Sequence, residues 1–343
     1  MGASWSELTG TQLPVVAAPM AGGATVPALV AAVRSAGGFG FLAAGYKAPE
    51  AVAAEMTQLR EAGVEFGVNL FAPHPVPIDE AEYLRYAEEL APEAAALGVA
   101  LDTPLRQDDD HWAEKVELLL EHPVPVVGVT FGLPPEPVVR ALQRAGSRVL
   151  ATVTSVAEAE AAVALGVDAL VAQGTEAGAH SGVHDPASGH PPLGTAELLP
   201  RVVAVSGLPV LAAGGIGRPE QVRDLVAAGA AAVMVGTALL RTDESGASRV
   251  HQDALADPRY TGTVVTRAFT GRPARGLRNG FIERHQDSAP LGYPAVHHLT
   301  RGLRTAAPAA GDADRLHLWA GTGYREARTG PAAAVVDRLA GLV

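Results

Sequence analysis

A glycine-rich stretch, QGTEAGAHSGVHD, holds the side chains best suited to chemistry in this chain. It covers residues 173–185 and carries one glutamate and two histidines among three glycines. His180 can donate, accept or transfer a proton near neutral pH, because the reference pKa of histidine is about 6.5. We expect it to lie in a flexible loop and to act at a bound cofactor, while Glu176 orients the loop through backbone amides.

Two other roles are open for the histidine of this stretch. A loop histidine is most often an ordinary surface side chain. His180 could also bind a metal with His184, Asp185 and His190. The glycines and Pro186 argue against the helix that would place such ligands on one face, so we expect no metal.

Two glycine turns form a second candidate site. AAGGIG (212–217) and VGTALL (235–240) each follow an apolar run. Such turns leave backbone N–H groups free to approach an anion, and neighbouring turns after the last two strands of a barrel form a phosphate site. The alternative is a pair of tight turns in which only glycine fits. The absence of a GKS or GKT lysine argues against an NTPase P-loop.

Polar side chains end two of the apolar runs. Asn69 is the last polar residue of EFGVNL, and Gln173 closes DALVAQ. A side-chain amide both donates and accepts hydrogen bonds, which suits a heterocycle such as a flavin ring edge. The same amides could instead cap a local backbone group, and the pattern does not decide between the two roles.

The elements that must position these residues are eight short apolar runs, each followed by a turn and a helical pattern. Runs that are apolar on both faces are typical of parallel strands covered by helices. Eight such units favour an α/β fold of the (β/α)₈ TIM-barrel type over a doubly wound sheet. The expected strands are 14–18, 39–43, 65–70, 123–131, 148–153, 168–173, 208–215 and 231–236.

The regular pattern stops after the eighth run. We expect a barrel over residues 1–240, a smaller inserted subdomain or lid over 241–310, and a C-terminal segment over 311–343 whose helix, at about 330–342, packs back on the barrel. Residues 79–122 hold more helix than one crossover needs.

Composition excludes several kinds of partner. The formal net charge is −11 without a basic cluster, which argues against nucleic acid and anionic membranes. The chain has no cysteine, and it has no run of the roughly 18 apolar residues that a membrane span needs. We expect a cytoplasmic protein, a monomer or a homodimer, that acts on a small molecule.

Taken together, the motifs resemble the nitronate monooxygenases, formerly called 2-nitropropane dioxygenases. The resemblance covers nearly the whole chain, in order, and rests on PVVAAPMAGG, FGVNLF, VTFGLP, QGTEAGAHSG, LPVLAAGGIG and VMVGTALL, followed by AFTGRPARGLRN, APLGYPAVHHLTRGLR and LWAGTGYREAR.

The resemblance implies a barrel that binds FMN without a covalent bond and oxidises alkyl nitronates, and in some members nitroalkanes, with O₂ to a carbonyl compound and nitrite. It makes His180 the catalytic residue at the reactive face of the flavin. It implies that FMN is bound by Pro19, Met20, Ala21, Gly22, Asn69, Thr130, Gln173, Gly178, Ala213, Gly214, Gly215, Gly236 and Thr237.

Three positions depart from the family pattern and bear on the substrate. Ala179 stands where the loop usually has a second glycine, Thr322 where a glutamine is frequent, and Gly292 where a proline is usual. The nearest alternative function is that of a flavin-dependent enoyl-acyl-carrier-protein reductase, which uses NAD(P)H and has a similar EAGxH loop. A flavin-binding protein without turnover is a further alternative.

Overall fold

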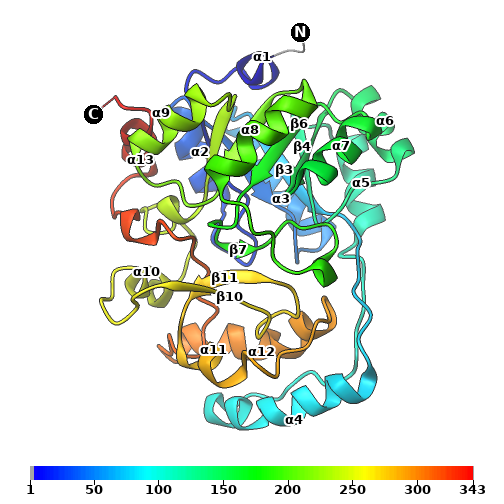
Figure 1. The fold of residues 1–343 in the computed structure, drawn as a ribbon, viewed down its shortest axis with the longest axis vertical. Helices are drawn as coiled ribbons and strands as arrows, with labels where there is room; N and C mark the ends of the chain where they lie inside the picture. Colours follow the sequence, from blue (N-terminus) through cyan, green and yellow to red (C-terminus); the bar gives the residue numbers. More distant parts are fainter. Residues whose placement is uncertain (1–3, 343) are drawn as a thin grey trace.

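The computed structural model describes residues 4–342 and contains a closed barrel of eight parallel strands, drawn in the upper part of Figure 1. Each of the eight expected apolar runs coincides with one strand, although β3 extends one residue beyond its run, to Phe71, and closure of the sheet excludes the doubly wound alternative. In barrel order the strands are β1 (Val15–Ala17), β2 (Phe39–Ala43), β3 (Gly67–Phe71), β4 (Val126–Thr130), β5 (Arg148–Val153), β6 (Ala169–Gln173), β8 (Val210–Ala213) and β9 (Ala232–Val235).

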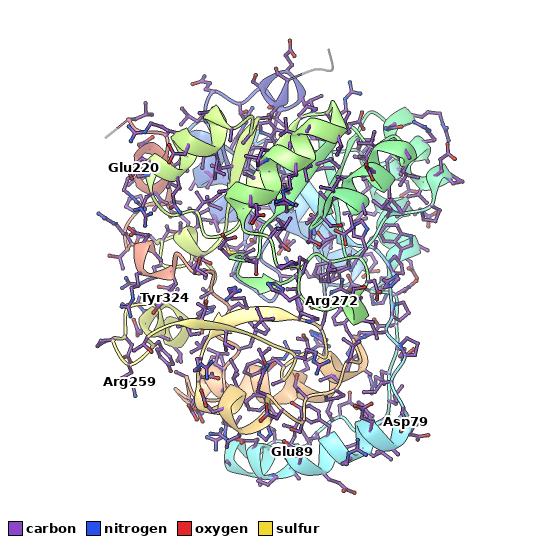
Figure 2. All side chains as sticks on the ribbon, in the orientation of Figure 1. Asp79, Glu89, Glu220, Arg259, Arg272 and Tyr324 are labelled. Carbon is purple, nitrogen blue, oxygen red and sulfur yellow. The ribbon has the colours of Figure 1, made fainter. Side chains whose placement is uncertain are left out.

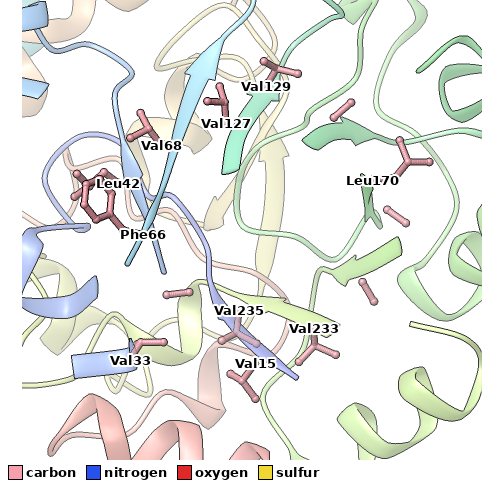
Figure 3. Packing of buried hydrophobic residues seen from close by; sticks show 14 of the residues in the cluster. Val15, Val33, Leu42, Phe66, Val68, Val127, Val129, Leu170, Val233 and Val235 are labelled. Atoms are coloured by element: carbon pink, nitrogen blue, oxygen red, sulfur yellow. The ribbon is translucent and has the colours of Figure 1, made fainter. Parts of the chain in front are cut away.

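The barrel strands bury side chains on both sides, as their sequences require. In β1, Val16 points into the barrel, whereas Val15 and Ala17 pack against the surrounding helices, because successive strand residues face opposite sides. Figure 3 shows part of the outer layer around Val15 and Val233, which pair where β1 meets β9 and the barrel closes. Trp5, 2% exposed, packs edge-on against Phe39 within the interior cluster.

Helices surround the barrel, and the last helix of the chain completes the ring by packing against α2 and α9. The surrounding helices are α2 (Pro27–Ser35), α3 (Pro49–Glu61), α5 (Trp112–Glu121), α6 (Glu136–Arg144), α7 (Val156–Leu165), α8 (Thr195–Ser206), α9 (Pro219–Ala227) and α13 (Ala332–Leu339), with the short α1 (Trp5–Thr9) near the N-terminus.

A second layer lies across one end of the barrel, in the lower half of Figure 1. Its antiparallel sheet has the order β10 (Thr263–Thr266), β11 (Ala274–Leu277), β7 (Ala179–His180). Its helices are α4 (Glu80–Leu97), α10 (Arg249–Ala254), α11 (Gly280–His285) and α12 (Ala295–Ala309).

The second layer has its own apolar cluster, in which α4 packs on α12 through residues such as Tyr86 and Leu299. The additional helix expected within 79–122 therefore belongs to this layer, while α5 packs against the barrel. The layer draws on α4 and β7 as well as residues 241–310, and the boundaries given above stay a prediction. The short 3₁₀ turns are η1 (Pro186–Ser188), η2 (Thr237–Leu239) and η3 (Tyr324–Glu326).

Within residues 4–342, none of the helices combines the length and the apolar character that crossing a membrane would require.

Candidate active site

A cavity of about 640 Å³ lies between the carboxyl ends of the barrel strands and the second layer. This volume is within the range of about 300–1,000 Å³ typical of small-molecule and cofactor sites. All fourteen residues expected at the catalytic or cofactor site line it, and their roles stay predictions. They are Pro19, Met20, Ala21, Gly22, Asn69, Thr130, Gln173, Gly178, His180, Ala213, Gly214, Gly215, Gly236 and Thr237.

The two glycine turns lie side by side because β8 and β9 are neighbours in the barrel. Gly214 and Gly215 have φ of +120° and +70°, and a β-carbon on Gly214 would come within 2.7 Å of Oγ1 of Thr195. Each turn has two consecutive backbone N–H groups with no acceptor within residues 4–342. They belong to Gly215 and Ile216 in the first turn and to Gly236 and Thr237 in the second. Free backbone N–H groups on neighbouring glycine turns are the kind of donor that anion sites in proteins use.

His180 does not lie in a flexible loop, contrary to the expectation from its glycine-rich surroundings. It lies in β7, which pairs with β11 opposite Ala274. Its Nε2 lies 2.9 Å from Oγ1 of Thr270. Aromatic rings surround the imidazole, with centroids 5.5 Å away at Phe131 and 5.8 Å away at Trp319. Residues of the second layer thus fix the position of the imidazole at the cavity.

Burial, and then the positive charges of Arg272 and Arg304, lower the pKa of His180 to about 3. The imidazole is therefore neutral at physiological pH in the absence of a bound anion. A neutral imidazole offers one hydrogen-bond donor and one acceptor.

Gln173 ends β6 as expected, whereas Asn69 lies in the middle of β3, which continues to Phe71, and the two amides have different surroundings. Oε1 of Gln173 accepts a hydrogen bond of 2.6 Å from the N–H of Gly182, so this side chain fastens the start of the His180 segment to β6. Oδ1 of Asn69 accepts from the Thr130 hydroxyl at 3.2 Å. Gln173 therefore caps a local backbone group, which is one of the two roles that the sequence left open. Both residues also line the cavity.

Glu176 has a structural role on the barrel side of the site. Its carboxylate accepts hydrogen bonds from the N–H and the hydroxyl of Thr195, at the start of α8, and its backbone oxygen accepts from the N–H of Thr322. Gly178 passes close to the C-terminal segment, because a β-carbon there would lie 2.5 Å from the nitrogen of Gly321. Gly321 in turn donates to Oγ1 of Thr237.

The other histidines of the opening stretch point elsewhere. Nε2 of His184 lies 3.0 Å from the carbonyl oxygen of Thr152, and Nε2 of His190 lies 2.8 Å from Oγ1 of Thr175. Among residues 4–342, no group of three or more histidine or acidic side chains has the arrangement that a metal ion needs.

The sequence reasoning missed the face of α12 that lines the cavity. Its residues follow a helical spacing of three and four that indicates one face, and they are His297, Arg301, Arg304, Thr305 and Pro308. His297 stacks on Tyr46, with ring centroids 3.9 Å apart. That spacing, within the motif APLGYPAVHHLTRGLR, was a signal that could have identified this face.

Two arginines give the site a positive electrostatic character: Arg304, which is partly buried and lines the cavity, and Arg272, which is buried behind the cavity wall. Arg272, labelled between the barrel and the second layer in Figure 2, is fully buried with its guanidinium 4.0 Å from the ring centre of Phe131. Nη2 of Arg304 donates to the His297 carbonyl at 2.8 Å. Burial lowers the pKa of each guanidinium to about 10, so both remain charged at neutral pH. Neither forms an ion pair with a carboxylate among residues 4–342, so the cavity favours an anionic ligand.

Neutral histidines at the cavity make the protein sensitive to acid. Burial lowers the pKa of His180 to about 3 and that of His251 to about 4. The unfolded chain binds protons below about pH 6.5 that the folded chain does not, so stability is full above that pH and is lost as the pH falls. We expect the free energy of unfolding to drop by about 1–2 kcal/mol per histidine between pH 7 and pH 5.

Urea unfolding of the apoprotein at the two pH values measures this loss. The variant His251→Gln removes one of the groups and should show a smaller drop than the parent. An equal or higher urea midpoint at pH 5 would contradict the assignment.

Ala179 occupies a backbone conformation that favours glycine. Its φ is +61°, and it pairs with Arg275 at the edge of the small sheet. The departure from the family pattern therefore places strain beside His180. We expect Ala179→Gly to raise the free energy of unfolding by about 0.5–1 kcal/mol, since relief of the left-handed strain exceeds the entropy cost of glycine. Thermal unfolding measures this change, and a lower midpoint would refute the strain.

These features define a class of protein. It is a TIM barrel with two neighbouring glycine turns at the strand ends and a positively charged ligand cavity that the second layer covers. The family model described as nitronate monooxygenase matches residues 4–341. A probable nitronate monooxygenase of Staphylococcus aureus (strain MSSA476) is 35% identical over 339 residues, which are 97% of this chain and 95% of the relative. The chain belongs to the nitronate monooxygenase family and is an enzyme of that family.

Two solved structures resemble this chain over nearly its whole length. The chain is similar to nitroalkane oxidase from Streptomyces ansochromogenes, with 47% identity, a TM-score of 0.94, and coverage of 99% of this chain and 97% of that one. It is also similar to FabK from Thermotoga maritima, with 25% identity, a TM-score of 0.76, and coverage of 99% and 95%.

Proposed function

We propose that this enzyme binds FMN in the cavity and oxidises alkyl nitronates with O₂ to a carbonyl compound and nitrite. The observation that carries the proposal is that one cavity is lined by free backbone N–H groups at the strand ends, by a neutral histidine and by Arg304, with the charged Arg272 buried close to that histidine. The N–H groups suit the phosphate of a mononucleotide, and the histidine with the two arginines suits an anionic substrate.

The residues present fit FMN. The free N–H groups of Gly215, Gly236 and Thr237 are the donors that would hold a phosphate. Asn69 and Gln173 line the same cavity, and would lie beside the flavin or its ribityl chain. When bound, the flavin supplies the redox chemistry by accepting electrons from the substrate and passing them to O₂.

The chain itself selects and positions the substrate. A nitronate carries a negative charge on its oxygens, and the charges of Arg272 and Arg304 stabilise such an anion inside the apolar cavity. The rings of Phe131, Tyr293 and Trp319 surround His180 and limit the entry of water around the reacting carbon. His180 is in position to hold or remove a proton at that carbon.

A reductase function on the same barrel is less well supported. The likeness to FabK is at 25% identity, against 47% for the nitroalkane oxidase. The chain also matches the nitronate monooxygenase model over residues 4–341.

Product analysis tests the proposal. The purified protein, loaded with FMN, is incubated aerobically with an alkyl nitronate, and oxygen consumption, nitrite and the carbonyl product are measured. We expect nitrite and carbonyl compound to form in equal amounts while oxygen is consumed. Flavin-loaded protein that forms no nitrite from a range of alkyl nitronates would contradict the proposed activity.

A further inference from the structure

The two ring nitrogens of His180 have different surroundings. Nε2 lies 2.9 Å from Oγ1 of Thr270, a residue in the turn that precedes β11. Within residues 4–342, Nδ1 has no hydrogen-bond partner, and it is not among the polar atoms sealed from solvent. Since the imidazole lines the cavity, Nδ1 is the nitrogen that a ligand meets.

The hydrogen of the Thr270 hydroxyl is directed to a backbone carbonyl. Oγ1 of Thr270 lies 3.3 Å from the carbonyl oxygen of Arg272, which can only accept. This distance is long for a hydroxyl hydrogen bond, but Arg272 is fully buried and its carbonyl has no other donor among residues 4–342. A buried carbonyl without a donor is costly, so the hydroxyl donates to it.

The direction of that bond decides the tautomer of the imidazole. A hydroxyl has one hydrogen, and here it is given to the Arg272 carbonyl, so Oγ1 of Thr270 accepts from Nε2–H of His180. A neutral imidazole has only one N–H, and Nδ1 therefore carries a free lone pair.

We propose that Thr270 is a positioning residue that holds His180 as the Nε2–H tautomer, so that the Nδ1 lone pair faces the cavity and acts as the base toward neutral nitroalkanes. This inference rests on the proposed function of the cavity. In the step that it allows, Nδ1 takes the α-proton of the nitroalkane and becomes Nδ1–H. The C–H bonding pair moves into the nitro group, and the products are a nitronate and an imidazolium.

The tautomer separates two classes of substrate. A neutral nitroalkane requires a base, and the Nδ1 lone pair supplies one. A nitronate added from solution has already lost this proton and does not require the lone pair. Thr270 is uncharged, so the charge that His180 gains in the step is balanced by the nitronate formed beside it, not by a buried carboxylate.

The tautomer can be measured without turnover. The FMN-loaded protein is labelled with ¹⁵N-histidine, and the signals of His180 are assigned by difference from His180→Asn. Nitrogen–proton correlation spectra are expected to show hydrogen on Nε2 and none on Nδ1. Thr270→Ser keeps the hydroxyl and should give the same pattern, whereas Thr270→Val keeps the shape without the hydroxyl and should give a mixture of tautomers.

Kinetics supply the second measurement. In Thr270→Val, we expect the turnover of a neutral nitroalkane relative to that of its preformed nitronate to fall by about 10- to 100-fold, and Thr270→Ser should restore the ratio. Hydrogen on Nδ1 in the parent protein would overturn the proposal, as would unchanged spectra and an unchanged ratio in Thr270→Val.

The test of the tautomer can fail independently of the test of the proposed function. If Thr270→Val does not fold, the parent spectrum and the Thr270→Ser variant still decide the tautomer. If the parent protein fails to oxidise nitronates, the proposed function is wrong, and the spectrum reports the tautomer independently.

Discussion

Replacing His180 by asparagine is expected to lower the turnover of neutral nitroalkanes by about 100- to 10,000-fold while the protein remains yellow with bound FMN. Asparagine cannot take up a proton, but its amide fits the space next to Thr270 and leaves the glycine turns untouched. Preformed nitronates should be affected much less, because they need no proton removal. Steady-state rates with a nitroalkane and with its nitronate, together with the flavin absorbance of the purified variant, check this result.

His184→Asn is the matched control for this variant. His184 lies four residues further along the same segment, bonds to the Thr152 carbonyl, and does not line the cavity. It should keep the activity of the parent on both substrates. Full nitroalkane turnover in His180→Asn would remove this histidine from the mechanism.

The second large effect is expected at the glycine turn after β9. Gly236→Asp should raise the dissociation constant of FMN by about 30-fold or more, since a buried unfavourable charge contact costs about 2–5 kcal/mol. The carboxylate would face the phosphate that the free N–H groups of Gly236 and Thr237 are proposed to hold. Fluorescence titration of the apoprotein with FMN measures the constant.

The fold should tolerate this substitution. Gly236 has φ of −114°, and a β-carbon there would lie 3.4 Å from Sδ of Met20, an ordinary contact. Gly236→Ala adds the β-carbon without charge and should bind FMN far better than Gly236→Asp. Equal FMN affinity in the two variants would place the phosphate elsewhere.

The barrel could be predicted because its strands carry their own signal. Runs such as RVLATV are apolar on both faces and are followed by a turn and a helical pattern, which is what a covered parallel strand requires. Closure of the sheet could not be read from any one run, because it depends on the pairing of β1 with β9. The same limit applies to α4, whose helical pattern does not reveal that it packs on α12.

The candidate site was predictable where it depends on strand ends, and less so where it depends on the second layer. Gln173 ends β6 and Gly214 directly follows β8, so both must lie at the same end of the barrel. His180 was expected in a flexible loop because glycines flank it. It lies in a strand of only two residues, which forms because it pairs with β11 and which the local sequence does not indicate. The role of Thr270 was equally hidden, since it comes from a segment 90 residues away.

Anaerobic mixing of the purified, FMN-loaded enzyme with propionate 3-nitronate, and separately with NADH, tests the central claim most directly. The flavin absorbance is followed in both mixtures. The account predicts rapid bleaching of the flavin by the nitronate and no comparable bleaching by NADH. Rapid bleaching by NADH without other substrate, and none by the nitronate, would contradict it and favour a reductase.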